Sequence, residues 1–142
     1  MLTLAVEHLR LIEGAAEAAY PEEACGLLLG HGALPGPITV TEVVKSANVA
    51  SGDRRRRFEV DPAVRFGVER RLRGTPQQLI GHYHSHPDGV ARPSDHDVAQ
   101  AYEPGLVWLI VAVADGKSQH AKAWALAGSG GNFEPITLEV AV

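Results

Sequence analysis

Two histidines and one aspartate stand at spacings that suit a bound metal ion. His84 and His86 lie two residues apart in the segment GHYHSHP at 81–87, and Asp97 follows a loop containing prolines and a glycine. Side chains two apart on a strand point to the same face, so both imidazoles can meet at one point. Two nitrogens and one carboxylate oxygen would leave the fourth tetrahedral position of zinc open to water, as in catalytic zinc sites.

Each part of this pattern also has a purely structural explanation. His82, His84 and His86 can be ordinary histidines of one strand. Ser94 and Asp97 fit the capping-box spacing, in which the serine accepts a hydrogen bond from a backbone amide at the start of a helix. The combination favours a metal site, because paired histidines precede a constrained loop and then a carboxylate on the helical face of Ser94.

The elements that would carry these residues follow a mixed α and β pattern. Asp61 is a good helix N-cap and Pro62 suits the first helical position. Tyr20-Pro21 ends the first helix, because the residue before a proline disfavours helical angles. We expect helices at 2–19, 61–72 and 94–102, and strands at 24–29, 38–46, 78–84, 106–114, 119–127 and 133–140, with a turn at 128–131.

The first helix and the apolar run at 106–114 define the expected core. The helix would bury the residues that recur at helical spacing, and the run would form a central strand covered on both faces. Together these elements predict a single domain, 1–142, of mixed α/β class with one sheet. The helical face consists of Leu4, His8, Leu11, Ile12, Ala15 and Ala19.

Composition and charge restrict the class of protein. The chain has 142 residues, 45% of them hydrophobic, which suffices for one compact domain. Its formal net charge of -4 argues against a general nucleic-acid binder, which usually presents a basic face. No apolar run is long enough to cross a membrane, and no signal peptide is evident. Cys25 is the single cysteine, so we expect a cytoplasmic protein in a reducing compartment, with homodimer formation left open.

Two further features carry alternatives. The consecutive arginines Arg54, Arg55, Arg56 and Arg57 lie in a polar segment and fit either a solvated loop or a contact for an acidic partner. Cys25 could serve a cysteine protease together with a histidine. A thiol in an apolar strand is more often inert packing, which favours the structural role.

The chemical motif extends over two separated segments. YPEEACGLLLG at 20–30 precedes HSHP at 84–87, which is followed by Ser94 and Asp97. This two-part pattern resembles the signature of the JAMM (JAB/MPN+) zinc metallopeptidases of the compact bacterial type. RFEVDP at 57–62 is similar to the family's connection into its second helix, so the resemblance covers nearly the whole chain. It implies an MPN/JAB, cytidine-deaminase-like fold, in which a mixed β-sheet is flanked by helices in a three-layer-like domain.

The resemblance also implies a role for each residue of the motif. His84, His86 and Asp97 would hold one Zn2+ per chain. Glu23 would act as the catalytic acid and base, because the family's glutamate lies three residues before the glycine of the first segment. Ser94 would stabilise the oxyanion that forms during hydrolysis.

The neighbours of the motif receive lesser roles. Glu22 lies one residue before the glutamate of the motif and falls outside its register. His82 shares the strand face of the two histidines, and we expect it beside them or in the core. Asp88 is placed to touch substrate, whereas Asp95 and His96 are expected to meet solvent.

The implied activity is hydrolysis of a peptide or isopeptide bond after a Gly-Gly tail. The expected substrate is a small ubiquitin-like sulfur-carrier protein, which would lose C-terminal residues or a cysteine. The short segment 98–105 has no room for the long second insertion of some ubiquitin-chain-cleaving members. The alternative is a non-catalytic MPN-type binding or scaffold module, against which the intact motif argues. A zinc deaminase needs a Pro-Cys-x-x-Cys ligand pair, which a single cysteine excludes.

Overall fold

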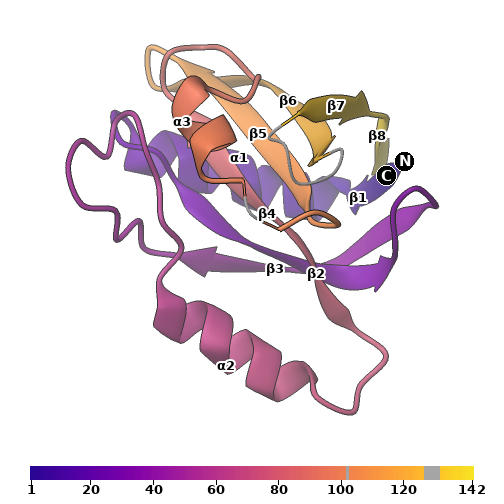
Figure 1. Ribbon diagram of the computed structural model, residues 1–142. Helices are drawn as coiled ribbons and strands as arrows, with labels where there is room; N and C mark the ends of the chain where they lie inside the picture. Colours follow the sequence, from indigo (N-terminus) through magenta and orange to yellow (C-terminus); the bar gives the residue numbers. More distant parts are fainter. Residues whose placement is uncertain (102, 127–131) are drawn as a thin grey trace.

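The computed structural model describes residues 1–101, 103–126 and 132–142. In this part of the chain, one mixed sheet has the strand order β7-β6-β5-β4-β2-β3-β1-β8 (Figure 1). Its strands are β1 (Leu2–Ala5), β2 (Cys25–Gly32), β3 (Ile38–Ser46), β4 (Gln78–His86), β5 (Val107–Ala114), β6 (Lys117–Leu126), β7 (Phe133–Ile136) and β8 (Leu138–Ala141). The helices are α1 (Val6–Ala19), α2 (Pro62–Leu72) and α3 (Asp95–Ala99).

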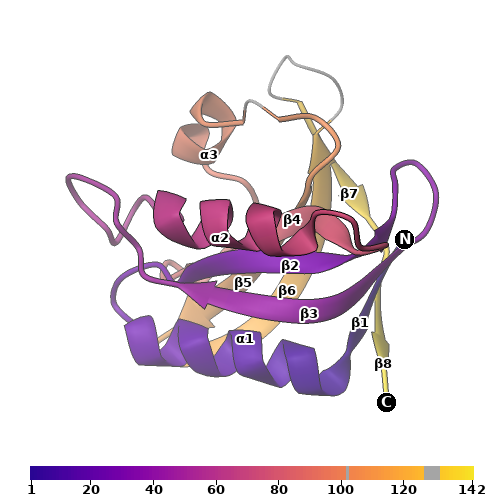
Figure 2. The same ribbon diagram turned by 90° about the horizontal axis from the view of Figure 1, so that it is seen from below.

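The helices lie on both faces of the sheet and make three layers. Figure 2 shows α1 on one side of the sheet and α2 and α3 on the other. Successive side chains of β2 point to opposite faces of the sheet, so this strand packs against helices on both sides. Leu28 belongs to the core with Ile12 of α1. Leu27 and Leu29 pack against Val68 of α2. The predicted fold class, a mixed sheet flanked by helices, is confirmed.

Local sequence signals account for the start of α2 and for the burial of β5. The Asp61 side chain accepts a hydrogen bond of 2.9 Å from the backbone amide of Ala63, and Pro62 occupies the first helical position of α2. The apolar run in β5 is buried along almost its whole length, as expected for a strand covered on both faces.

The N-terminus corrects one prediction. Leu2–Ala5 is the strand β1, parallel to both β3 and β8, and the helix begins only at Val6. Leu2 and Leu4 are fully buried, and their period-two spacing is that of a strand. Leu4 also lies at helical spacing from His8 and Leu11, which led to the prediction of a helix. The helical face was predicted in part: Ile12 lies in the core as expected, whereas Leu11 is 52% exposed. Leu9 and Ala16 also face the core.

The predicted C-terminal strand at 133–140 is two strands. β7 pairs antiparallel with β6, and β8 pairs parallel with β1 at the other edge of the sheet, although only Thr137 separates them in sequence. The sheet therefore curls around α1 until its two edges meet (Figure 1). Ala127 and the predicted turn at 128–131 lie outside the described residues.

The strand and helix that carry the motif also differ from their predicted lengths. β4 continues to His86, two residues beyond its predicted end, because Ser85 and His86 still pair with Val111 and Ala112 of β5. Helix α3 ends at Ala99, and Tyr102, its predicted end, lies outside the described residues. None of the described helices is long and apolar enough to span a membrane.

Candidate metal centre

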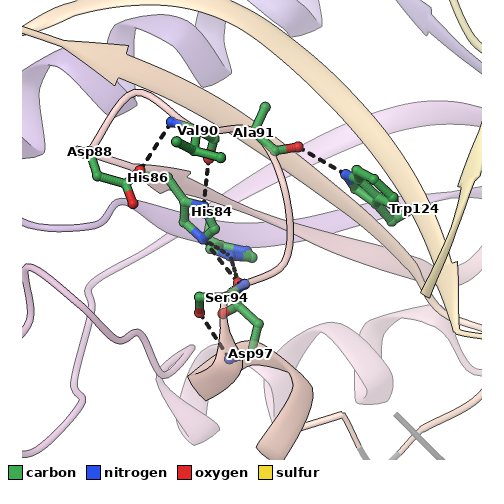
Figure 3. Close-up of polar contacts among 8 residues, drawn as sticks. All are labelled: His84, His86, Asp88, Val90, Ala91, Ser94, Asp97 and Trp124. Atoms are coloured by element: carbon green, nitrogen blue, oxygen red, sulfur yellow. Dashed lines mark hydrogen bonds and ion pairs between the residues drawn. The ribbon is translucent and has the colours of Figure 1, made fainter. Parts of the chain in front are cut away.

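Three potential ligand atoms converge where β4 ends and α3 begins. His84 Nε2 lies 3.0 Å from His86 Nε2 and 3.1 Å from Asp97 Oδ2, and His86 Nε2 lies 2.9 Å from the same carboxylate oxygen (Figure 3). All three side chains are buried. The two histidines point the same way because they are two apart on one strand, as the sequence predicts.

The loop between β4 and α3 is fixed at three points so that Asp97 returns to the histidines. The backbone amide of Val90 donates to Asp88 Oδ1 at 3.0 Å, and His86 Nδ1 contacts the Val90 carbonyl at 2.8 Å. The indole of Trp124 donates to the Ala91 carbonyl at 3.0 Å (Figure 3). Ala91 itself is buried against β5, which seats the loop on the sheet.

These contacts determine which ring nitrogen faces the other donors. The Val90 carbonyl can only accept, so His86 Nδ1 carries a proton and donates it. In the neutral imidazole, Nε2 then presents a lone pair toward His84 and Asp97. Hydrogen bonding of the distal nitrogen to a backbone carbonyl is how metal-binding histidines are usually oriented.

The donor set fits a zinc ion. Ligand atoms at about 2.0–2.1 Å from a tetrahedral zinc are roughly 3.3 Å apart, close to the 2.9–3.1 Å between these three atoms. Asp97 Oδ1 and His84 Nδ1 are buried without a hydrogen-bond partner among the described residues. The Nε2 lone pair of His86 and the carboxylate oxygen of Asp97 repel each other at this separation unless a proton or a cation lies between them. Nitrogen with carboxylate ligands suits zinc.

Electrostatics favour positive charge at this point. Burial acts to raise the pKa of Asp97, but the imidazoles of His84 and His86 outweigh it and hold that pKa well below its usual range. Burial lowers the pKa of His84. For His86, burial is outweighed by the hydrogen bond and charge of Asp97, and its pKa is raised. The aspartate is therefore a carboxylate that requires a cation.

Ser94 makes the capping box that its spacing predicts. Its Oγ accepts from the backbone amide of Asp97 at 3.1 Å, and its own amide donates to Asp97 Oδ2 at 2.9 Å. The second bond orients the carboxylate toward the histidines. Ser94 is half-buried and also lines the open cleft beside His86.

Glu23 lies next to the two histidines and Glu22 does not. Glu23 is 4% exposed, and it offers a carboxylate oxygen within 4.8 Å of ring nitrogens of His84 and His86. Burial raises the pKa of Glu23 to about 8, although the charge of His86 acts to lower it. Glu22 is exposed. Hence the structure brings Glu23 together with the four other motif residues.

Sequence reasoning missed two residues that hold Glu23 in place. Ser85, between the two histidines, accepts from the Ala24 amide at 2.8 Å through its Oγ. Asn48 donates to the carbonyls of Glu23 and Arg57, each at 3.0 Å. A serine inside the HSHP motif was a visible signal, whereas an asparagine in a polar loop carried none.

Aromatic rings surround the imidazole of His84. The ring of Phe58 stacks on it with centroids 4.1 Å apart, and Trp108 meets it edge-on at 5.6 Å. His82 packs against Trp108 at 4.4 Å, and burial lowers its pKa to about 3. His82 therefore lies beside the metal centre and outside its ligand triangle.

The remaining candidates line the cleft or are sealed from it. Asp88, Asp95 and His96 border the opening, with Asp95 exposed and His96 half-buried, so the expectation of solvent holds fully for Asp95 only. Cys25 is buried and its thiol contacts the Ala47 carbonyl at 3.6 Å. Burial raises the pKa of the Cys25 thiol to about 12, which makes it a poor nucleophile.

Known proteins show the same sequence pattern. The family described as prokaryotic homologs of the JAB domain matches residues 5–127. The chain is 33% identical over 120 residues to a desampylase from Haloferax volcanii, covering 84% of this chain and 79% of that protein. It is 25% identical over 122 residues to a CysO-cysteine peptidase from Mycobacterium tuberculosis, covering 84% and 78%.

A solved structure shows the same fold. The solution structure of a protein from Desulfitobacterium hafniense superposes with a TM-score of 0.82 at 27% identity, over 99% of this chain and 93% of that one. The family match spans the buried histidines, the capped α3 and Glu23. The chain therefore belongs to the family of prokaryotic homologues of the JAB domain.

Proposed function

We propose that this chain is a zinc-dependent peptidase that hydrolyses an amide bond at the C-terminal tail of a small ubiquitin-like sulfur-carrier protein. One observation carries the proposal: a buried carboxyl group, Glu23, lies beside a triangle of ligand atoms from His84, His86 and Asp97. The names of the two curated relatives, a desampylase and a CysO-cysteine peptidase, support the same class of substrate.

His84, His86 and Asp97 would hold one zinc ion. Zinc lowers the pKa of a coordinated water to around 7 and polarises a carbonyl oxygen. His86 is kept in the required tautomer by Val90, and the carboxylate of Asp97 is oriented by the amide of Ser94.

Glu23 moves the proton. Its carboxyl group would take a proton from the attacking water and deliver it to the nitrogen of the leaving amine. Burial holds its pKa near the pH of the cell, where a group can both accept and return a proton. Glu23 Oε1 is buried without a hydrogen-bond partner among the described residues, so its acceptor capacity is unused.

Ser94 can cap the helix and assist catalysis with different parts of one hydroxyl. Its oxygen accepts from the Asp97 amide, which uses a lone pair and leaves the hydroxyl proton available. That proton would be donated to the oxyanion of the tetrahedral intermediate. The two explanations of Ser94 are therefore compatible.

The neighbours of β4 limit how a tail can reach the site. An extended peptide can bind a protein by adding to a free strand edge. β4 is hydrogen-bonded to β2 on one side and to β5 on the other, so it offers no edge for this. A Gly-Gly tail remains suited to the site, because glycine has no Cβ and lets the backbone approach closely.

Cleavage of a defined carrier tests the proposal. A sulfur carrier with residues added after its Gly-Gly tail is incubated with the zinc-loaded protein and analysed by mass spectrometry. We expect loss of the added residues directly after Gly-Gly, and no loss when both glycines are changed to valine. A carrier that stays intact would favour the alternative, a non-catalytic MPN-type binding or scaffold module.

A further inference from the structure

The four consecutive arginines divide into two pairs with different surroundings. Arg54 Nε donates to the Ala50 carbonyl at 2.9 Å, and Arg57 Nη1 donates to the Ser51 carbonyl at 3.4 Å, so this pair fastens the loop to itself. The side chains of Arg55 and Arg56 are 66% and 86% exposed. Arg54 is exposed as well, but its guanidinium donates to the loop, and it is not among the residues that line the cleft beside Glu23.

This loop is attached directly to the backbone of Glu23. The Glu23 amide donates to the Arg54 carbonyl at 2.8 Å, and Asn48 links the Glu23 carbonyl to the Arg57 carbonyl. Arg55 and Arg56 line the same cleft as Glu23 and His86. The arginines are thus held at the entrance of the candidate centre.

One carboxylate holds both exposed guanidinium groups without neutralising them. Asp53 Oδ1 lies 3.0 Å from Arg55 Nε, and Asp53 Oδ2 lies 3.8 Å from Arg56 Nε. Asp53 is shared by the two guanidinium groups, and the charge of Glu22 also acts on Arg55. Several N–H donors of the two groups remain available. Arg56 is the less engaged of the two, because its contact with Asp53 is longer and its side chain is more exposed.

The charges of the cleft define the chemistry of a matching ligand. Asp88 and Asp95 border the same opening, so the cleft presents carboxylates as well as guanidinium groups. A leaving group that carries a terminal carboxylate a few bonds from the scissile nitrogen fits this arrangement, since planar guanidinium groups bind carboxylates well. The lysine side chain released from an isopeptide bond has no carboxylate at that position.

We propose that Arg56, together with Arg55 and positioned by Asp53, binds the terminal carboxylate of the leaving group, so that the enzyme prefers short C-terminal extensions to isopeptide bonds. This preference rests on the proposed peptidase function and specifies its substrate. The contact is present in the bound substrate as well as in the transition state, so it should act mainly through KM.

Two matched carriers test the preference. Both have the same short extension after Gly-Gly; one ends in a free carboxylate and the other in a carboxamide. Wild type should cleave the free acid with a kcat/KM about fivefold or more above that of the amide, as expected for one or two exposed ion pairs. The difference should lie in KM and should shrink at high salt.

Variants assign the effect to the arginines. The double variant Arg55→Gln with Arg56→Gln should cleave both carriers at the wild-type rate for the amide, with unchanged zinc content. Arg10 is an exposed arginine of α1 on the opposite face of the sheet, so Arg10→Gln is the matched control and should behave as wild type.

Equal cleavage of acid and amide by wild type would overturn the inference while leaving the proposed function intact. An equal slowing of both carriers by the double variant would also overturn it. Failure of wild type to cleave either carrier would overturn the proposed function and the preference together.

Discussion

Ser85 of β4 and Ala24, the residue directly before β2, are joined by two hydrogen bonds. The Ser85 amide donates to the Ala24 carbonyl at 3.0 Å, and the Ala24 amide donates to Ser85 Oγ at 2.8 Å. Ser85 lies between His84 and His86, and Ala24 directly follows Glu23. The pair therefore sets the position of the acid–base group relative to the two histidines.

Ser85→Ala should loosen this connection. The substitution leaves the buried Ala24 amide without its acceptor, which should destabilise the protein by about 1–3 kcal/mol. Turnover should fall because Glu23 is less well positioned, while zinc content stays at the wild-type level. Ser85→Thr keeps the hydroxyl and serves as the control. Denaturant unfolding and a cleavage assay measure both effects, and an alanine variant with wild-type stability and rate would show that the pair positions nothing.

Glu23→Gln and Glu22→Gln separate the two adjacent glutamates. The first should abolish turnover, because the amide cannot carry a proton, while fold and zinc content are retained. The second should change the rate little, because Glu22 is exposed. Rates of carrier cleavage with matched zinc loading provide the measurement. An active Glu23→Gln enzyme would remove the proposed acid–base role.

Ser94→Ala and Ser94→Gly distinguish capping from oxyanion stabilisation. Alanine removes the cap and should cost about 0.5–2 kcal/mol of stability, whereas glycine at an N-cap costs only a few tenths. Both variants lose the hydroxyl proton, so both should lose roughly a hundred- to a thousandfold in kcat. Thermal unfolding and kcat are measured side by side. Near-normal turnover in the glycine variant would restrict Ser94 to capping.

Cys25 should be unreactive in the folded protein. With its pKa raised by burial to about 12, only on the order of one thiol in ten thousand is ionised at pH 8, and the thiolate is the reactive form. Labelling by iodoacetamide at pH 8 should be very slow when the protein is folded and fast in denaturant. The folded rate should rise as pH increases toward that pKa. Rapid labelling of folded protein with loss of activity would revive the cysteine-protease alternative.

The sequence predicted how the candidate ligands are arranged on their strand better than it predicted the strands near the edges of the sheet. The spacing of His84 and His86 placed two imidazoles on one strand face, and Asp61-Pro62 marked the start of α2, because these signals are local. β1 was missed because Leu4 fits the strand period with Leu2 and the helical period with His8 and Leu11, and only the pairing of β1 with β3 and β8 decides between them.

Long-range contacts explain what local patterns could not supply. The division of β7 from β8 at Thr137 depends on the two edges of a curled sheet meeting. Asn48 holds Glu23 across 25 residues of sequence, a contact with no local signature. The arginine run divides into a pair that bonds to loop carbonyls and a pair that lines the cleft, and this division likewise depends on which carbonyls the folded loop presents.

The central claim is that His84, His86 and Asp97 hold the zinc ion. Zinc stoichiometry tests this claim most directly, because two sets of buried groups could serve as the ligands. Glu23, His84 and His86 offer atoms within 4.8 Å of one another, whereas those of His84, His86 and Asp97 lie within 3.1 Å. Elemental analysis of protein purified without chelator should give one zinc per chain in wild type and in Glu23→Gln, and close to none in His84→Ala, His86→Ala and Asp97→Asn. Zinc retained by Asp97→Asn but lost from Glu23→Gln, or absent from wild type even after zinc is added, would contradict the account.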